Sequence, residues 1–151
     1  MPKELQPITF LVTALNEEEK IEGTAKTITE AVEQFSCDYE ILMVNDGSTD
    51  ATPRIMDRMA KENPRVRVVH NERNLGLGGA YKRGVRHASK KYVMWVSGDN
   101  AETPGNIVNI ISHVGEADVV VPVLKATKAR PWLRRFTSRG FTITVNTLFG
   151  L

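Results

Sequence analysis

The stretch Tyr39-Glu-Ile-Leu-Met-Val-Asn-Asp-Gly-Ser-Thr-Asp50 decides the fold of this chain, because an apolar run passes directly into a polar turn. Residues 39–44 have the composition of a β-strand, and residues 46–50 have that of a turn. Thr52 and Pro53 follow as a helix N-cap and first helical residue, and the predicted helix runs to about residue 64. The stretch therefore predicts a strand, a turn and a helix in that order.

The same unit recurs along the chain. Further strands are predicted at residues 8–14, 66–69, 92–96 and 118–124, and further helices at 21–35, at 80–88 and around Ile107, Ile110, Ile111 and Val114. The continuous apolar run at 92–96 is typical of a strand buried on both faces. The alternation predicts an α/β domain, a mostly parallel sheet flanked by helices, which binds ligands beyond the carboxyl ends of its strands.

Composition places the chain among ordinary globular proteins. Its 151 residues are 41% hydrophobic and 25% charged, which suits one domain with a full core. The single cysteine, Cys37, cannot form an internal disulfide and indicates a reducing compartment. No signal peptide opens the chain, and no run approaches the ~20 apolar residues that span a bilayer. We therefore expect a cytoplasmic protein.

Charge is distributed unevenly between the two ends. Residues 1–118 carry 14 basic and 18 acidic side chains, a net −4, whereas the last 33 residues carry six basic and no acidic ones, a net +6. We expect a binding domain at 1–124 and a basic segment at 125–151 with an anionic partner such as a phosphate or a lipid headgroup. Nucleic acid is not expected, because the segment has few aromatic residues and no RNA-binding signature.

Two of the predicted strand-end loops are more polar than packing requires. In the first, Asn16 and Glu17 either cap the following helix or point into the crevice at the sheet edge. In the second, residues 45–50 exceed what a turn needs, since a turn requires only a glycine and one Asx residue. Asp46 is a candidate acceptor for a base or ribose, and Ser48 is a candidate substrate contact in the same turn.

The other two loops suggest phosphate and metal binding. Arg73, Gly76 and Gly78 precede a helix, where glycines admit a ligand and the helix N-terminus favours anions. In the last loop, Asp99 and Glu102 offer hard oxygen ligands suited to Mg²⁺ or Mn²⁺ carrying a diphosphate. The simpler interpretation of that loop is an Asx turn that caps the next helix.

Together these stretches resemble the family 2 glycosyltransferases with the Rossmann-like GT-A fold, especially the dolichol-phosphate-mannose-synthase-like branch. The matching segments, in order, are Thr13-Ala-Leu-Asn-Glu17, Val44-Asn-Asp-Gly-Ser-Thr-Asp50, Arg73-Asn-Leu-Gly-Leu-Gly-Gly-Ala80 and Tyr92-Val-Met-Trp-Val-Ser-Gly-Asp99. The resemblance implies that the nucleoside is held by Ala14, Asn16, Glu17 and Asp46. It also implies a catalytic Asp99 that ligates the metal, although this chain has Gly98-Asp99-Asn100 where the family usually has Asp-x-Asp.

The resemblance further implies transfer of a sugar from a UDP- or GDP-sugar to an acceptor, a polyprenyl phosphate in this branch, with inversion. Arg134, Arg135 and Arg139 of the basic segment would then lie on the acceptor side, at the cytoplasmic face of a membrane. The chain stops where that acceptor site should be completed, which suggests truncation. A catalytically incomplete nucleotide-binding module therefore remains the alternative.

Two other classes are excluded on specific residues. A dinucleotide-binding oxidoreductase needs a G-x-G-x-x-G turn after the first strand, where this chain has Ala14-Leu-Asn-Glu-Glu. A receiver domain needs an aspartate at the end of the third strand, where this chain has Val69-His70.

Overall fold

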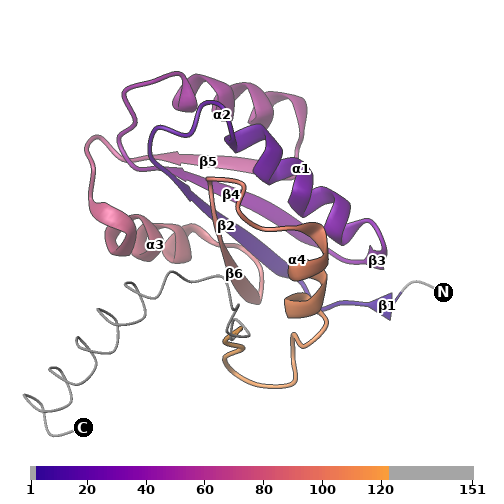
Figure 1. Ribbon diagram of the computed structural model, residues 1–151. Coiled ribbons are helices and arrows are strands. Elements are labelled where there is room, and N and C mark those ends of the chain that lie inside the picture. The colour runs from indigo at the N-terminus through magenta and orange to yellow at the C-terminus, as the bar shows by residue number, and fades with distance from the viewer. Residues whose placement is uncertain (1–2, 123–151) are drawn as a thin grey trace, which may run out of the picture. The chain divides into compact units, whose positions relative to one another are not determined.

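A four-stranded parallel sheet forms the centre of the fold. The computed structural model of the chain describes residues 3–122 (Figure 1), of which 3–120 belong to one compact unit. The order of the strands in the sheet is β5-β4-β2-β6. The strands are β2 (Ile8–Ala14), β4 (Tyr39–Asn45), β5 (Val66–His70) and β6 (Tyr92–Ser97), and the helices are α1 (Ile21–Val32), α2 (Thr52–Glu62), α3 (Gly76–His87) and α4 (Pro104–Ile111). The predicted parallel α/β class is confirmed.

The register of the sheet brings the strand ends together. Thr13 of β2 pairs with Val44 of β4 on one side and with Ser97 of β6 on the other. Because all these strands are parallel, the loops that follow them leave from the same edge. The sheet therefore gathers segments 30 to 80 residues apart at one place.

Side chains alternate between the two faces of the sheet. Phe10, Val12 and Met43 belong to the core shared with α1, α2 and α4, whereas Leu11 and Leu42 pack with Ala80 of α3 on the other face. Figure 1 shows α1 and α2 together on one side of the sheet and α3 on the other. Full burial of each such side chain contributes roughly 1.5–3 kcal/mol, so these contacts hold the helices in place.

Helix α3 approaches the sheet closely through a glycine. A Cβ atom at Gly84 would lie 2.2 Å from Cδ1 of Leu11, which is fully buried. Gly84 is itself buried and lies in the same helix as Ala80. The small residues at these two positions allow the helix backbone to rest directly on β2.

Two predicted helices differ from the structure at their N-termini. Helix α3 begins at Gly76 rather than at residue 80, so the glycine-rich loop is partly the first turn of the helix. Thr52 begins α2 but does not cap it, because its Oγ1 accepts from the backbone N–H of Glu17 at 2.8 Å. Asp50 takes over this role, since its Oδ1 accepts from the N–H of Thr52 at 2.9 Å.

The predictions for the last two strands were wrong in part. Residues 118–122 form no strand, and Val119 and Val121 are 74% and 73% exposed. A β-rich run needs a neighbouring strand to pair with, and none lies beside it in the part of the chain that the structure describes. Strand β6 is not buried on both faces, because it lies at the sheet edge with Trp95 42% exposed.

The opposite end of the sheet is held by a buried carboxylate. Glu40 is 4% exposed and accepts hydrogen bonds from Thr9 Oγ1 at 2.7 Å, Ser89 N at 2.6 Å and Arg67 Nη1 at 2.7 Å. Burial alone would raise its pKa, but these hydrogen bonds outweigh burial and lower the pKa to about 2. Glu40 thus ties β2, β5 and the loop before β6 to β4.

A second, two-stranded sheet is formed by β1 (Lys3–Glu4) and β3 (Phe35–Ser36), and it is separate from the main sheet. Cys37 is partly buried, which raises the pKa of its thiol.

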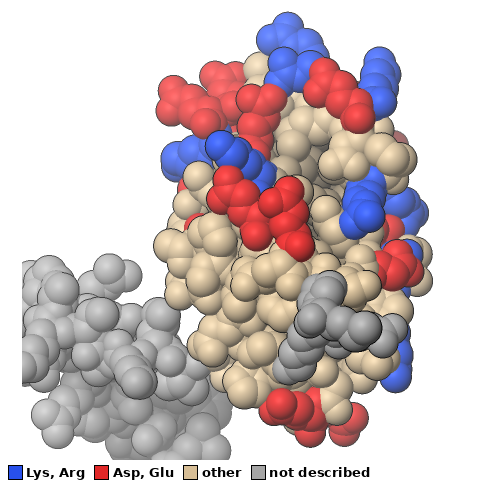
Figure 2. Space-filling model, turned by 90° about the vertical axis from the view of Figure 1, so that its right-hand side faces the viewer, with Lys and Arg blue, Asp and Glu red and all other residues tan. Residues whose placement is uncertain are grey.

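Acidic and basic side chains are mixed on the upper part of the face seen in Figure 2. Among residues 3–122, no helix has the length and apolar character needed to cross a membrane.

Candidate donor-binding site

A cavity opens at the carboxyl ends of β2, β4 and β6, beside the start of α3. It has a volume of about 310 Å³. The residues that line it are Thr13, Ala14, Leu15, Glu17, Asp46, Asn74, Gly76, Leu77, Ala80, Trp95 and Ser97. Four predicted site residues are therefore brought together here: Ala14, Glu17, Asp46 and Gly76.

Asp46 is the buried acid of this cavity, at 4% exposure. Its Oδ1 accepts from Asn71 Nδ2 at 2.7 Å and from the backbone N–H of Leu75 at 2.9 Å. No hydrogen-bond donor to Oδ2 is found within residues 3–122. One oxygen of Asp46 thus holds the loop that leads into α3, and the other has no hydrogen-bond partner among those residues.

The first two loops bind each other across the sheet edge. Asn16 has a left-handed backbone, with φ 56°, and its N–H donates to Ser48 Oγ at 3.0 Å. In return, Asn16 Oδ1 accepts from the N–H of Thr49 at 2.9 Å. Glu18 adds a second reciprocal pair, because its N–H donates to Asp50 Oδ2 at 3.2 Å and its Oε2 accepts from Ala51 N at 2.7 Å.

These contacts account for Asn16 and Ser48 without a ligand. Neither residue lines the cavity, and each uses a side-chain oxygen to hold the other's loop. Their predicted contact with substrate therefore stays a prediction, and the structure gives them a role in shaping the site.

The glycine-rich segment contributes to the cavity through its first residues. Gly76 has φ 72°, and its N–H donates to Asn74 Oδ1 at 2.7 Å. Gly76 and Leu77 line the cavity, whereas Arg73 and Gly78 do not. The nearby Gly47 also has a positive φ, 74°, and a Cβ there would lie 2.6 Å from the carbonyl carbon of Arg73. The turn and the segment before α3 are therefore in backbone contact.

Seven residues of the cavity wall were not among the predicted site residues, and three of these seven come from the strands. Thr13 and Ser97 are paired neighbours in register on β2 and β6, and Trp95 Nε1 donates to Thr13 Oγ1 at 2.9 Å. The available signal was a polar residue at the last position of β6 and at the last but one of β2.

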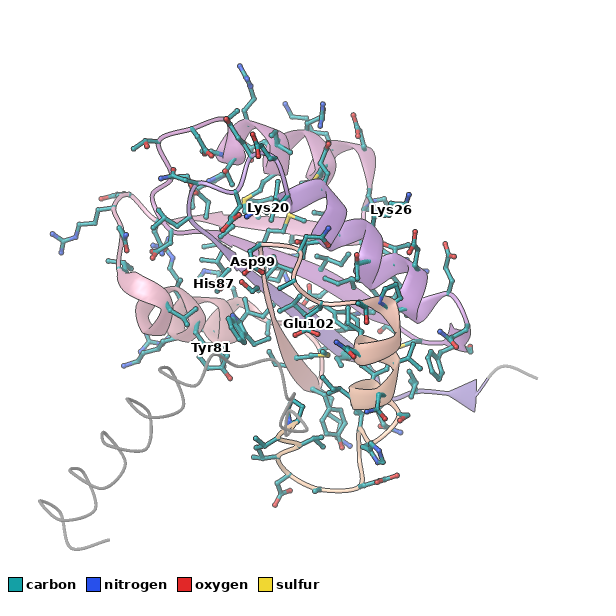
Figure 3. The ribbon with its side chains drawn as sticks, viewed as in Figure 1. Lys20, Lys26, Tyr81, His87, Asp99 and Glu102 are labelled. Carbon is teal, nitrogen blue, oxygen red and sulfur yellow. The ribbon has the colours of Figure 1, made fainter. Side chains whose placement is uncertain are left out.

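The loop after β6 carries the two predicted metal ligands (Figure 3). Asp99 Oδ1 accepts from the N–H of Ala101 at 3.2 Å, and Glu102 Oε2 accepts from Asn106 Nδ2 at 3.2 Å. Asn100 turns to α1 instead, since its Oδ1 accepts from Thr27 Oγ1 at 3.1 Å and its N–H donates to Thr24 Oγ1 at 3.1 Å. Asn100 therefore supplies no ligand on the cavity side.

The donor set at this loop suits a metal ion only in part. Residues 3–122 contain no group of three or more His, Cys, Asp or Glu side chains that could hold an ion. Asp99 has one carboxylate oxygen with no hydrogen-bond partner among those residues, and it lies two positions after the cavity-lining Ser97. Such a set fits an ion that is held jointly by Asp99 and by the phosphates of a ligand.

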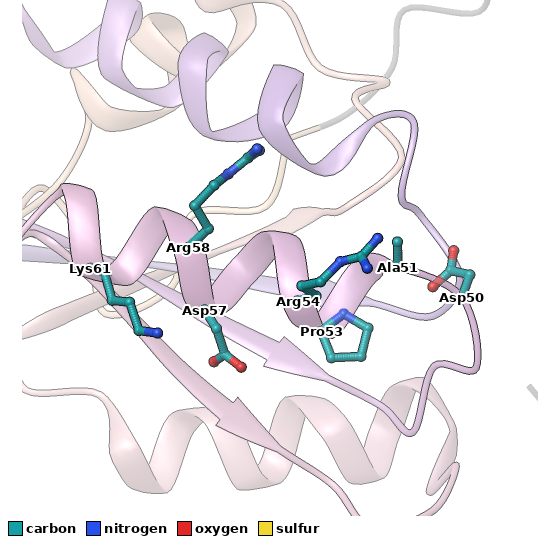
Figure 4. Close-up of a pocket in the computed structure, with 7 residues that line it drawn as sticks. All are labelled: Asp50, Ala51, Pro53, Arg54, Asp57, Arg58 and Lys61. Carbon is teal, nitrogen blue, oxygen red and sulfur yellow. The ribbon is translucent and has the colours of Figure 1, made fainter.

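A larger cavity of about 710 Å³ runs along α2 and is shown in Figure 4. Its charged side chains are partly paired: Arg58 with Glu22, and Asp57 with His70 at 3.0 Å. Its lining, from Asp50 to Lys61, comes from α2 and the turn just before it, whereas the strand-end cavity is lined from several segments. We therefore place the site at the strand ends despite the smaller volume.

Three predicted residues, Arg134, Arg135 and Arg139, lie outside the described residues. The predicted boundary between 124 and 125 lies there as well. Both stay predictions.

A parallel sheet with a cavity at its strand ends has the ligand-binding geometry of an open α/β domain. The chain belongs to glycosyl transferase family 2, whose sequence profile matches residues 9–149. The strand-end cavity is therefore the candidate donor site of a family 2 domain.

Two curated relatives and one solved structure illustrate the similarity. The dolichyl-phosphate beta-glucosyltransferase ALG5C of Trichomonas vaginalis is 32% identical, over 91% of this chain and 45% of its own length. The undecaprenyl-phosphate 4-deoxy-4-formamido-L-arabinose transferase of an Enterobacter species is 26% identical, over 89% and 42%. The mannosyltransferase PcManGT of Pyrobaculum calidifontis, solved with GDP-Man and Mn²⁺, has a TM-score of 0.56 and 26% identity, over 65% and 29%.

This likeness confirms the GT-A type of nucleotide-sugar-binding fold. The chain spans less than half the length of these curated relatives.

Proposed function

We propose that the cavity at the strand ends binds the nucleoside of a UDP- or GDP-sugar, and that this domain is the donor half of an enzyme that glycosylates a polyprenyl phosphate. The observation that carries the proposal is Asp46, a buried acid in the cavity with one oxygen held by the fold and the other unpartnered within residues 3–122. A carboxylate oxygen in this position accepts hydrogen bonds from a base or from ribose hydroxyls. The relatives' printed names, dolichyl phosphate and undecaprenyl phosphate, support the acceptor class.

The chain's own residues have distinct parts in this proposal. Asp46 fixes the nucleoside, the indole of Trp95 offers an apolar wall, and Ser97 lines the cavity at the start of the loop that carries Asp99. Asp99 would hold Mn²⁺ or Mg²⁺ together with that diphosphate, and Glu102 is the further candidate on the same loop. A divalent ion, when bound, neutralises the negative charge that develops on the departing diphosphate. The solved mannosyltransferase with GDP-Man and Mn²⁺ supports this use of a metal.

No strong general base is required by this proposal. A polyprenyl phosphate is already an anion at neutral pH, so its oxygen can displace the diphosphate directly at the anomeric carbon, with inversion. None of the described histidines lines the cavity, and His87 and His113 are bonded to the Arg83 carbonyl and to Glu116. The location at the cytoplasmic face of a membrane is part of the same proposal.

Calorimetric titration with UDP and GDP, with and without Mn²⁺, tests the donor site. Asp46→Asn keeps the Oδ1 acceptor for Asn71 and Leu75 but replaces the unpartnered oxygen with a donor. We expect this variant to lose nucleotide binding while it stays folded. Asp38→Asn is the matched control, because Asp38 is exposed and pairs with Lys90 away from the cavity.

Ligand at a hundredfold its dissociation constant should stabilise the native chain by about 2.7 kcal/mol, and Asp46→Asn should abolish this gain. Equal nucleotide affinity in the native chain and in Asp46→Asn would remove Asp46 from the site.

The alternative is a module that binds the donor without transferring the sugar. This alternative is favoured by the small number of metal ligands, because residues 3–122 contain no group of three His, Cys, Asp or Glu side chains that could hold an ion. Incubation with a nucleotide-sugar, Mn²⁺ and a short polyprenyl phosphate separates the two. Nucleotide binding without glycolipid product would establish the module.

A further inference from the structure

The geometry points to His70 as a positioning residue for the donor site: it holds the Asn45 amide and, through it, the turn at residues 45–50. His70 ends β5 and does not line the cavity. Its Nδ1 lies 3.1 Å from Asn45 Nδ2, and its Nε2 lies 3.0 Å from Asp57 Oδ1. The inference rests on the proposed function, in which this turn carries the nucleoside contact.

The partners of Asn45 determine which way its amide faces. Asn45 Oδ1 accepts from the backbone N–H of Ser48 at 3.0 Å, which fixes the oxygen toward the turn. The amide nitrogen therefore faces His70 and donates to it. Since Asn45 is only 4% exposed, water has little access to replace either bond.

These contacts select one tautomer of His70. The ring must present an unprotonated Nδ1 to the Asn45 amide, and it must carry its hydrogen on Nε2, because the Asp57 carboxylate only accepts. Asp57 on α2 thus holds the ring in the form that can accept from Asn45. A carboxylate that orients an imidazole in this way fixes both its rotation and its hydrogen position.

The turn transmits this alignment to the site. Ser48, whose N–H is held by Asn45, accepts through its Oγ from the N–H of Asn16 at 3.0 Å. Asp46 follows Asn45 directly, and the carbonyl of Asn45 accepts from the N–H of Asn71 at 2.8 Å. Asn71 is also the residue whose amide holds Asp46 Oδ1. A displaced Asn45 would therefore disturb Asn71, one of the two residues that hold Asp46 Oδ1.

Two substitutions of His70 distinguish the loss of the hydrogen-bond acceptor from the loss of side-chain volume. His70→Asn presents a carbonyl oxygen near the place of Nδ1 and keeps an acceptor for Asn45, whereas His70→Leu removes the acceptor. His70 is partly exposed, so neither change leaves a cavity in the core. His113→Asn is the matched control, because His113 pairs with Glu116 and does not line the cavity.

UDP and GDP affinities of the full chain, measured by calorimetry at pH 8, give the first readout. We expect His70→Leu to bind about two- to tenfold more weakly, the range expected for one lost hydrogen bond. His70→Asn, which keeps an acceptor for Asn45, should bind like the native chain. Native affinity at pH 8 in His70→Leu, with binding still lost in Asp46→Asn, would overturn the inference and leave the donor site in place.

Amide hydrogen exchange at Ser48 in the absence of nucleotide gives the second readout. The Ser48 N–H should exchange faster in His70→Leu than in the native chain, in His70→Asn or in His113→Asn. If no form of the chain binds UDP or GDP, the proposed function fails, and the positioning of a nucleoside by His70 fails with it. The exchange rates then still show whether His70 holds the turn, so the two failures are distinguishable.

Discussion

Two carboxylates of the proposed site, Asp46 and Asp99, each give one oxygen to the fold. Asp46 gives one oxygen to Asn71 and Leu75 and keeps the other free of partners within residues 3–122. The two carboxylate oxygens of Asp99 differ in the same way, because Oδ1 accepts from the N–H of Ala101 and Oδ2 has no hydrogen-bond partner within residues 3–122. Substitution by asparagine is therefore the informative change at both positions, since it preserves Oδ1.

At Asp99 we expect the asparagine variant to lose affinity for a metal–diphosphate pair but not for a bare nucleoside. The loop bond to Ala101 should survive, so folding is unchanged, while the charge that attracts a divalent ion is lost. We expect Mn²⁺-dependent GDP or UDP binding to weaken at least about tenfold, which corresponds to 1.4 kcal/mol.

Titrations of UDP and uridine, and of GDP and guanosine, with and without Mn²⁺ check this expectation. Glu102→Gln is the companion variant on the same loop. Equal losses for the diphosphate and the nucleoside in Asp99→Asn would assign Asp99 to the loop's structure alone.

Among the elements, α3 depends most directly on one position. Gly84 has no room for a Cβ above the buried Leu11, whereas Gly78 of the same helix has no atom within 4 Å of such a Cβ. Alanine in a helix is intrinsically better than glycine by about 1 kcal/mol. The two glycines therefore separate helix propensity from packing.

We expect Gly84→Ala to lower the free energy of unfolding, because overpacking a core costs about 1–3 kcal/mol and exceeds the gain in propensity. Gly78→Ala should be neutral or stabilising. Urea denaturation of both variants measures the difference. Stabilisation by Gly84→Ala would show that α3 can move away from the sheet at little cost.

Glu40 stabilises the strands through hydrogen bonds that depend on pH. Because the pKa of Glu40 in the folded chain, about 2, lies below the ordinary glutamate value of 4.5, ionised Glu40 stabilises the fold above pH 4.5, and this contribution is lost as the pH falls toward 2. The contribution is at most about 3 kcal/mol, since one pKa unit is 1.36 kcal/mol. Arg67 is half exposed, so solvent screens its part of this.

We expect Glu40→Gln to have a lower free energy of unfolding than the native chain at pH 7. This difference should become smaller between pH 4.5 and pH 2. Denaturant unfolding at a series of pH values checks this, with Asp38→Asn as an exposed control. A difference in the free energy of unfolding that stays constant down to pH 2 would contradict the role of the ionised carboxylate.

For the molecule as a whole, charge separates the described domain from the basic segment. We predict that residues 128–141, which lie outside the described residues, bind anionic membrane surfaces or a polyprenyl phosphate through Arg130, Arg134, Arg135 and Arg139. Each basic residue near an anionic surface contributes about 1 kcal/mol. Arg134→Ala with Arg135→Ala should thus weaken vesicle binding about thirtyfold.

Cosedimentation with anionic and neutral vesicles at several salt concentrations measures this binding. Arg54→Ala with Lys61→Ala on α2 removes the same charge elsewhere and is the control. A native chain that stays in the supernatant with anionic vesicles at low salt would exclude the membrane surface.

The sequence was sufficient for the four strands of the sheet and for the meeting of their following loops, because parallel strands bring these loops to one edge. It could not show that Asn16 and Ser48 bind each other's loops, since this depends on the register of β2 with β4. Nor could it separate Trp95 from the core, because an apolar strand has the same composition at the edge of a sheet as at its centre. Residues 118–122 lacked a partner strand, which composition does not reveal.

The reciprocal bonds between the loops at 14–18 and 46–52 also constrain how this sequence can vary. Asn16 needs an acceptor at position 48 and a donor at position 49, and Glu18 needs the amide of residue 51. Each of these bonds joins a side-chain oxygen of one loop to a backbone N–H of the other, so each side chain depends on the backbone path of the opposite loop. Loops exchanged singly between two homologues should therefore lose function that the exchanged pair retains.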